Sequence, residues 1–273
     1  GYEVRAIDKL GHDPRHPVTT DWPHLVEQLT QFIEREVDEP AYLVGHSLGG
    51  YLSMMVANRH PHLARGVVVL DSPLLHGWKA TGIALAKQTR TMGQVMPSRI
   101  SAQRTQEWPN QRAVHEHFSA KRKFAAFDSA VLADYLARGT EGHADGRARL
   151  LSFRREVETA IYNTMPHGLL QEFKRHPFQC PIAFVGGTRS RESRLVGLSG
   201  TKQIVGERLS WIDGSHLYPF ERPRETVAEV LAWLRRDAVS LGADPLRVMV
   251  MGDSAGGKLS AASCGAKASR WSM

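Results

Sequence analysis

The stretch of sequence that decides the fold is Leu43-Val44-Gly45-His46-Ser47-Leu48-Gly49-Gly50. An apolar run leads into it and helix-forming residues follow, so a G-x-S-x-G pattern lies between a strand and a helix. Glycines at both ends keep this tight turn free of clashes while Ser47 is held outward in a strained conformation. The N–H of Leu48 opens the helix and faces a developing oxyanion. The pattern predicts Ser47 as a nucleophile and Leu48 as an oxyanion-hole donor.

A serine hydroxyl is a weak nucleophile, so Ser47 requires a histidine base held by a carboxylate, in the chain order serine, acid, histidine. A histidine in the right place follows the apolar run 208–212, in Asp213-Gly214-Ser215-His216-Leu217-Tyr218-Pro219-Phe220. We therefore predict His216 as the general base. His46 lies inside the turn and is expected to shape the pocket without taking part in catalysis.

Two residues are candidates for the acid. The loop after the apolar run 182–185 is the usual place, but it reads Gly186-Gly187-Thr188-Arg189-Ser190-Arg191-Glu192 and offers only Glu192, slightly beyond the customary spacing. Asp71 is the alternative, because it ends the apolar run that follows the turn, in Val69-Leu70-Asp71-Ser72-Pro73. Glu192 is slightly preferred, and Asp71 stays open.

Apolar runs and helical periodicity alternate along the chain. The predicted strands cover 42–44, 67–70, 182–185 and 208–212, and the predicted helices cover 24–37, 48–58, 194–204 and 224–236. Such alternation favours an α/β fold, with a mostly parallel sheet flanked by helices.

The alternation stops for about a hundred residues, where the pattern is helical, for example over 129–137 and 153–162. A loop of that length is rare, so we expect an inserted helical cap over 74–177. The core is then 1–73 and 178–236, followed by a C-terminal extension over 237–273. Five aromatic residues of the cap are candidates to line a pocket: Trp78, Trp108, Phe124, Phe127 and Tyr162.

The composition of the 273 residues suits one large globular domain with an insertion, since 42 % are hydrophobic. The two cysteines form no metal-binding motif, which favours a reducing compartment, and we expect a cytoplasmic protein without metal or cofactor. No apolar run is long enough to span a membrane. The net charge of +7 is spread along the chain, so we expect no nucleic-acid partner.

Residues 1–234 resemble the α/β-hydrolase superfamily, specifically its capped serine esterase-like members. Besides the serine turn, Asp8-Lys9-Leu10-Gly11-His12 is similar to the D-x-x-G-H turn after the fourth strand of that family. The resemblance implies cleavage of a small-molecule ester or thioester through an acyl-enzyme. It also implies alternatives, because the superfamily includes C–C hydrolases, peroxidases and acyltransferases. A serine nucleophile argues against epoxide hydrolases and haloalkane dehalogenases, which carry aspartate there.

The chain departs from the family pattern at its start. The family's first three strands have no counterpart before Gly1, and neither does the loop that supplies its second oxyanion donor. The N-terminal strands are therefore expected to be missing, and a hydrolase-fold binding protein with impaired catalysis is a further alternative.

The tail repeats the elbow pattern, in Gly252-Asp253-Ser254-Ala255-Gly256-Gly257, which resembles the elbow of hormone-sensitive-lipase-like esterases. No Asp, Glu or His follows Gly257, so Ser254 lacks the later partners of a triad in the usual order. The apolar run 247–251 before it leads to the hypothesis that this run fills a vacant strand position in the sheet. The sequence carries no motif that fixes an oligomeric state.

Overall fold

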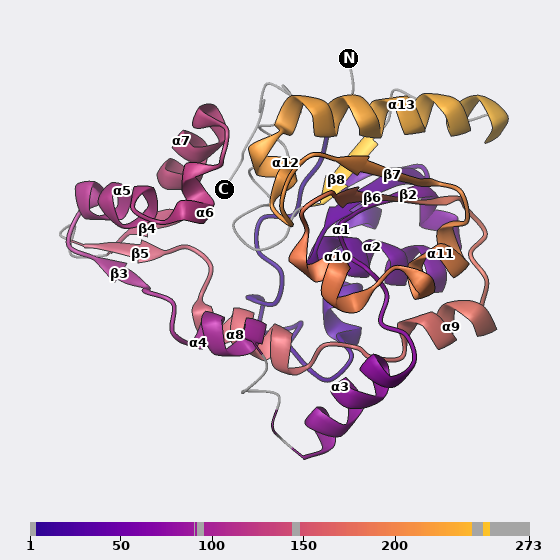
Figure 1. Cartoon of the computed structure of the whole chain (residues 1–273), viewed down its shortest axis with the longest axis horizontal. Helices are drawn as coiled ribbons and strands as arrows, with labels where there is room; N and C mark the ends of the chain where they lie inside the picture. The colour runs from indigo at the N-terminus through magenta and orange to yellow at the C-terminus, as the bar shows by residue number, and fades with distance from the viewer. Residues whose placement is uncertain (1–3, 90, 92–95, 144–147, 242–247, 252–273) are drawn as a thin grey trace.

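A computed structural model describes residues 4–89, 91, 96–143, 148–241 and 248–251. Its centre is a five-stranded sheet in the order β7-β6-β2-β1-β8, and every neighbouring pair is parallel. The strands are β1 (Ala41–His46), β2 (Ala64–Leu70), β6 (Ile182–Gly187), β7 (Leu209–Ile212) and β8 (Val248–Met251). The four predicted strands and the parallel α/β architecture are thus confirmed (Figure 1).

Side chains of alternate strand residues pack on opposite faces of this sheet, as strand geometry requires. On one face, Leu43 and Val67 join a core formed with α1 (Pro23–Glu36) and α2 (Leu48–Arg59). On the other face, Tyr42 and Val68 pack against Trp233 of α13. Other core-region helices are η1 (Pro61–Leu63), α9 (Leu169–Arg175), α10 (Arg191–Val196), α11 (Ser199–Val205), α12 (Tyr218–Glu221) and α13 (Pro223–Leu241). Helices therefore cover both faces, and α13 lies across one of them in Figure 1.

The segment predicted as a helical cap contains more than helices. Its elements before α9 are α3 (Trp78–Gln88), α4 (Met96–Ala102), β3 (Glu107–Trp108), α5 (Gln111–Ser119), α6 (Arg122–Ala125), α7 (Ser129–Arg138), β4 (Thr140–Gly142), β5 (Arg149–Leu151) and α8 (Arg155–Asn163). The three strands form a small antiparallel sheet in the order β3-β5-β4. The expectation of a helical cap did not include these strands, because strands of two or three residues leave no periodic signal.

Among the described residues of this segment, those in its middle form a core of their own. That separate cluster consists of Trp108, Val114, Phe118, Phe124, Leu136 and Leu151. Residues after it, such as Ile161 and Phe173, belong to the main core. We call residues 107–151 the insert below; in Figure 1 its described elements lie to one side of the main sheet. Trp108 and Phe124 thus pack inside the insert, while Trp78 is 78 % exposed.

The tail contributes a strand to the sheet. Strand β8 runs parallel to β1, with Val248 opposite Tyr42 and Met251 opposite Gly45. This pairing confirms the hypothesis that the run 247–251 takes a strand position, over the residues described as β8. Ser254 and the elbow pattern around it lie outside the described residues. Among the described residues, no helix has the length and apolar character needed to cross a membrane.

Candidate active site

Ser47 occupies the sharp turn between β1 and α2, with φ 53° and ψ −118°. A non-glycine residue rarely adopts a positive φ, and here the surroundings impose it. A Cβ at Gly45 would lie 2.2 Å from the Gly49 carbonyl oxygen, and one at Gly50 would lie 2.2 Å from the Ser72 hydroxyl. That hydroxyl donates to the Ser47 carbonyl at 2.7 Å. The turn is therefore packed too closely to relax, and Ser47 is held in place.

His216 lies on the loop between β7 and α12, and its ring reaches both Ser47 and Asp71. Its Nε2 is 3.1 Å from Ser47 Oγ, and its Nδ1 is 2.6 Å from Asp71 Oδ2. A carboxylate only accepts, so Nδ1–H donates to Asp71, and the unprotonated Nε2 is the atom that can accept the proton of the serine hydroxyl. The structure thus brings together a serine hydroxyl, an imidazole and a carboxylate in one hydrogen-bonded line, an arrangement that suits nucleophilic catalysis.

Asp71 is fully buried and well supplied with donors. The Gly187 N–H and the Ser193 hydroxyl donate to Oδ1 at 3.1 and 2.8 Å, and the Ser190 hydroxyl donates to Oδ2 beside His216. Burial raises the pKa of Asp71, but hydrogen bonding and charge from His216, then the two serine hydroxyls, outweigh it, so the pKa is lowered overall. Asp71 therefore carries its negative charge next to the ring.

Glu192, the other predicted acid, lies nearby on α10 without reaching the ring. Its Oε2 is 4.0 Å from His216 Nδ1, beyond hydrogen-bond distance, and its side chain is 48 % exposed. Both predicted acids, Asp71 and Glu192, thus lie near His216 at the carboxyl-terminal edge of the sheet, and of the two only Asp71 forms a hydrogen bond with its ring.

Sequence reasoning missed the two hydroxyls that serve Asp71. Ser190 caps the start of α10 by accepting the Ser193 N–H at 3.0 Å, and Ser193 lies one turn along. A serine before a short helix is a recognisable cap signal. Nothing local in that signal indicates that both hydroxyls turn toward a residue more than a hundred positions earlier.

Asp71, Glu192 and His216 together offer ligand atoms within 4.8 Å of one another, which raises the question of a metal site. Both Asp71 oxygens, however, already accept two hydrogen bonds each. A metal ion would have to displace these donors from a fully buried group. The donor set fits an acid that orients a histidine better than a metal ligand.

Leu48 is the first residue of α2, directly after Ser47. The first N–H groups of a helix have no intrahelical partner and lie at its positive end. The Leu48 N–H is therefore placed where an oxyanion on a carbonyl attacked by Ser47 can accept a hydrogen bond.

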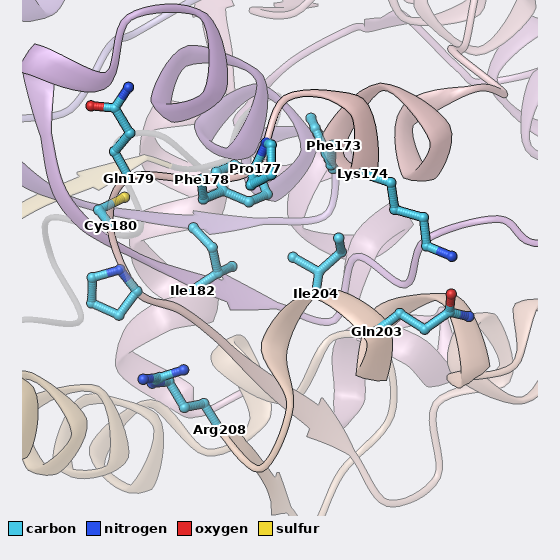
Figure 2. A pocket seen from close by; sticks show the side chains of 11 residues that line it. Phe173, Lys174, Pro177, Phe178, Gln179, Cys180, Ile182, Gln203, Ile204 and Arg208 are labelled. Carbon is cyan, nitrogen blue, oxygen red and sulfur yellow. The ribbon is translucent and has the colours of Figure 1, made fainter.

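Two of the cavities in the described part of the chain differ in their relation to this site. A cavity of about 510 Å³ is lined by Cys180 and Ile182 at the start of β6 and by Arg208 before β7 (Figure 2). Ser47 and Asp71 lie at the other, carboxyl-terminal edge of the sheet, so this larger cavity is remote from them. A much smaller cavity, of about 10 Å³, lies beside the site and is lined by Tyr51, Leu74, Leu75, Met165, Pro166, His167 and Leu169.

The chain is similar to several known proteins. The chain shares 40 % identity over 52 residues with the chloroplastic pheophytinase of Arabidopsis thaliana, which covers 19 % of this chain and 11 % of that protein. It shares 23 % identity over 246 residues with ethanol acetyltransferase 1 of Wickerhamomyces anomalus, covering 85 % of this chain and 61 % of that protein. The chain thus spans less than two thirds of the length of these two relatives.

Solved structures show the same fold at low sequence identity. The chain superposes on E-2-(acetamidomethylene)succinate hydrolase with a TM-score of 0.62 at 18 % identity, covering 84 % of this chain and 78 % of that one. It superposes on an esterase of M. tuberculosis with a TM-score of 0.58 at 16 % identity, covering 84 and 74 %.

Two family models match, and together they span nearly the whole chain. The model described as "alpha/beta hydrolase fold" matches residues 217–271, which include β8. The model described as "Alpha/beta hydrolase family" matches residues 1–230, which include the serine turn, Asp71 and the His216 loop. This second match covers most of the chain, and the structure has a parallel sheet with a hydrogen-bonded serine, histidine and aspartate at its carboxyl-terminal edge. The chain therefore belongs to the alpha/beta hydrolase family.

Proposed function

We propose that this protein is a serine hydrolase that cleaves small carboxylic esters through an acyl-enzyme on Ser47. The observation that carries the proposal is the line from Ser47 Oγ to His216 Nε2 at 3.1 Å, and from His216 Nδ1 to Asp71 Oδ2 at 2.6 Å. The esterase among its structural neighbours supports the same chemistry.

In the first half of the reaction, Ser47 Oγ attacks the ester carbonyl while His216 Nε2 takes the hydroxyl proton. The Leu48 N–H stabilises the oxyanion, a contribution of about 3 kcal/mol for one such donor. The tetrahedral intermediate collapses, the C–O bond to the alcohol breaks, and His216 returns the proton to the leaving oxygen. Water then attacks the acyl-enzyme by the same steps and releases the acid.

We propose Asp71 as the acid of this triad. It bonds directly to the Nδ1–H, and its low pKa keeps it charged opposite the imidazolium that forms during attack. Glu192 is half-exposed and farther from the ring, so its charge is screened by solvent.

Acyl transfer to an alcohol is a second candidate, favoured by the match to ethanol acetyltransferase over 85 % of this chain. It shares the acyl-enzyme and differs only in the second nucleophile, since an alcohol replaces water. The ratio of transesterified to hydrolysed product from p-nitrophenyl acetate in added ethanol distinguishes the two reactions.

A fluorophosphonate probe, which phosphonylates an activated serine, tests the proposal. We expect a single adduct on the peptide that carries Ser47, loss of labelling in Ser47→Ala, and parallel loss of p-nitrophenyl butyrate hydrolysis. Ser254→Ala is the matched control, because it removes the serine of the other elbow pattern, and it should leave both intact. Folded protein that is not labelled at Ser47 would contradict the proposal and favour a binding protein. Loss of activity in Ser254→Ala alone would move the nucleophile to Ser254.

A further inference from the structure

His46, the residue before the nucleophile, is buried and makes a polar contact that the reaction itself does not use. It is 5 % exposed, and its Nε2 lies 2.8 Å from the backbone carbonyl oxygen of His216. A carbonyl only accepts, so Nε2 carries the proton and donates it. Burial, followed by the charge of His216, lowers the pKa of His46 to about 3. His46 is therefore a neutral donor beside the base and adds no competing positive charge.

Two consecutive residues, His46 and Ser47, thus contact His216, one at its backbone and the other at its ring. His46 holds the backbone carbonyl of His216, and Ser47 meets its ring at Nε2. The rest of the loop is anchored elsewhere: the Arg189 N–H donates to the Gly214 carbonyl at 2.8 Å, and Glu221 accepts the Ser215 N–H at 3.0 Å. The bond from His46 thus links the base directly to the strand that carries the nucleophile.

The ring of His46 also contacts a pair of aromatic side chains. Phe220 meets it edge-on with ring centroids 5.6 Å apart, and Phe220 in turn stacks on Phe127 of the insert at 5.2 Å and an interplanar angle of 24°. The Asp128 N–H donates to the Phe220 carbonyl at 2.8 Å, so backbone and ring contacts join the insert to the His216 loop at the same place. Aromatic pairs of this kind stabilise a contact beyond the effect of the area they bury.

We propose that His46 is a positioning residue for the catalytic base, and that the series Phe127, Phe220 and His46 couples the docking of the insert to the position of His216. The proposal rests on the function proposed above, because it gives His216 the role of general base. Displacement of a catalytic group by about 1 Å costs on the order of a hundredfold in rate. A base held from the nucleophile's own strand is protected against such displacement.

Variants at His46 separate the donor from the ring. His46→Gln keeps an N–H donor at similar reach, whereas His46→Phe keeps a ring and loses the donor. We expect kcat to fall about tenfold to a hundredfold in His46→Phe with KM within about twofold, and to stay within about fivefold in His46→Gln. His12→Phe is the matched control: His12 also bonds a backbone carbonyl, that of Leu10 at 3.0 Å, and meets Phe153 edge-on at 4.3 Å. It should leave kcat within about twofold.

The coupling to the insert has its own pair of variants. Phe127→Leu removes the ring that stacks on Phe220. Phe124→Leu is the control: it disturbs the same aromatic cluster, since Phe124 contacts Phe127, but among the described residues Phe124 forms no ring pair with Phe220. We expect a fall in kcat of several-fold in the first and less than twofold in the second. Equal falls in both would show general loosening of the insert and overturn the coupling.

A measurement that needs no activity keeps this inference separate from the proposed function. Nitrogen-15 NMR of histidine-labelled protein reports tautomer and protonation, and we expect His46 to be the neutral Nε2–H form from pH 5 to 9. The downfield proton signal of the His216–Asp71 bond should shift in His46→Phe and not in His12→Phe. A protonated or Nδ1–H form of His46, or wild-type kcat in folded His46→Phe, would overturn the proposal. Absence of Ser47 labelling would overturn the function and leave the NMR result to stand.

Discussion

Ser47 and Asp71 each have a φ of 53°, the left-handed conformation that most residues avoid. They follow the ends of the adjacent strands β1 and β2, and backbone bonds hold both: the Ser47 N–H donates to Leu70 at 3.1 Å and the Asp71 N–H to Val185 at 2.9 Å. Strain at two neighbouring residues of one site is typical of pre-organised catalytic groups. In this conformation the Ser47 hydroxyl meets Nε2 of His216 and the Asp71 carboxylate meets Nδ1 of the same ring.

The sequence predicted Ser47 and His216 but could not choose between the two candidates for the acid. Both candidates lie within 4.0 Å of His216 Nδ1, so spacing alone could not separate them. The choice depends on burial and on the hydroxyls of Ser190 and Ser193, which come from another strand's end and carry no signal at Asp71 itself.

Substitution of each carboxylate tests the assignment. In Asp71→Asn the amide no longer holds the Nδ1–H tautomer, and we expect kcat for p-nitrophenyl butyrate to fall about 10⁴-fold. Glu192→Gln, the matched control, should stay within about threefold, because its exposed charge acts through solvent. A larger loss in Glu192→Gln than in Asp71→Asn would reverse the assignment.

The lowered pKa of Asp71 also predicts how stability depends on pH. A carboxyl whose pKa is lower in the folded than in the unfolded state stabilises the fold above the unfolded pKa, about 3.9, and loses that contribution as the pH falls through the folded value. The difference in free energy of unfolding between wild type and Asp71→Asn should therefore shrink between pH 7 and pH 3. Urea denaturation at both values measures it, and a constant difference would contradict it.

At the scale of elements, periodic segments were predicted well and short ones were not. Helix α1 follows its apolar spacing, with Leu25, Leu29 and Ile33 on the buried side. The single helix predicted over 194–204 is instead α10 and α11, separated at Gly197, whose φ of 80° ends the first of them. A glycine in an otherwise helical pattern was the available signal.

Strand β8 is an element whose contribution can be measured directly. In a parallel pair, alternate residues donate toward the neighbouring strand, so of Met249→Pro and Val250→Pro one removes a ladder bond with β1 and the other removes an N–H that points away. We expect the variant that removes the ladder bond to lower the free energy of unfolding by about 1 kcal/mol more than the other, or roughly 3 °C in Tm. Val250→Thr keeps the N–H and serves as control. Tm values unchanged in both proline variants would show that the pairing contributes nothing.

At the scale of the whole molecule, the parallel strands place chemistry and cavities at defined edges of the sheet. Ligands of open parallel sheets bind at the carboxyl ends of the strands, where Ser47, Asp71 and His216 meet. The small cavity lined by Tyr51 and Leu75 lies at this edge, one helical turn beyond Ser47, whereas the larger cavity of Figure 2 lies at the opposite edge. We therefore expect the acyl group of an ester substrate at the carboxyl-terminal edge and not in the larger cavity.

Bulky side chains in the two cavities test this division. The small cavity has room for about one water molecule, so a long acyl chain must push its lining apart, and Leu75→Trp makes that lining bulkier. We therefore expect kcat/KM for p-nitrophenyl octanoate to fall about tenfold, while the acetate ester, which does not extend to this lining, stays within about twofold. Gln203→Trp is the matched control, since Gln203 is an exposed residue lining the larger cavity. It should change neither ester. If Gln203→Trp lowered kcat/KM for the octanoate ester and Leu75→Trp did not, the acyl group would bind in the larger cavity at the opposite edge of the sheet. The substrate would then bind away from Ser47, which contradicts the division of the two edges.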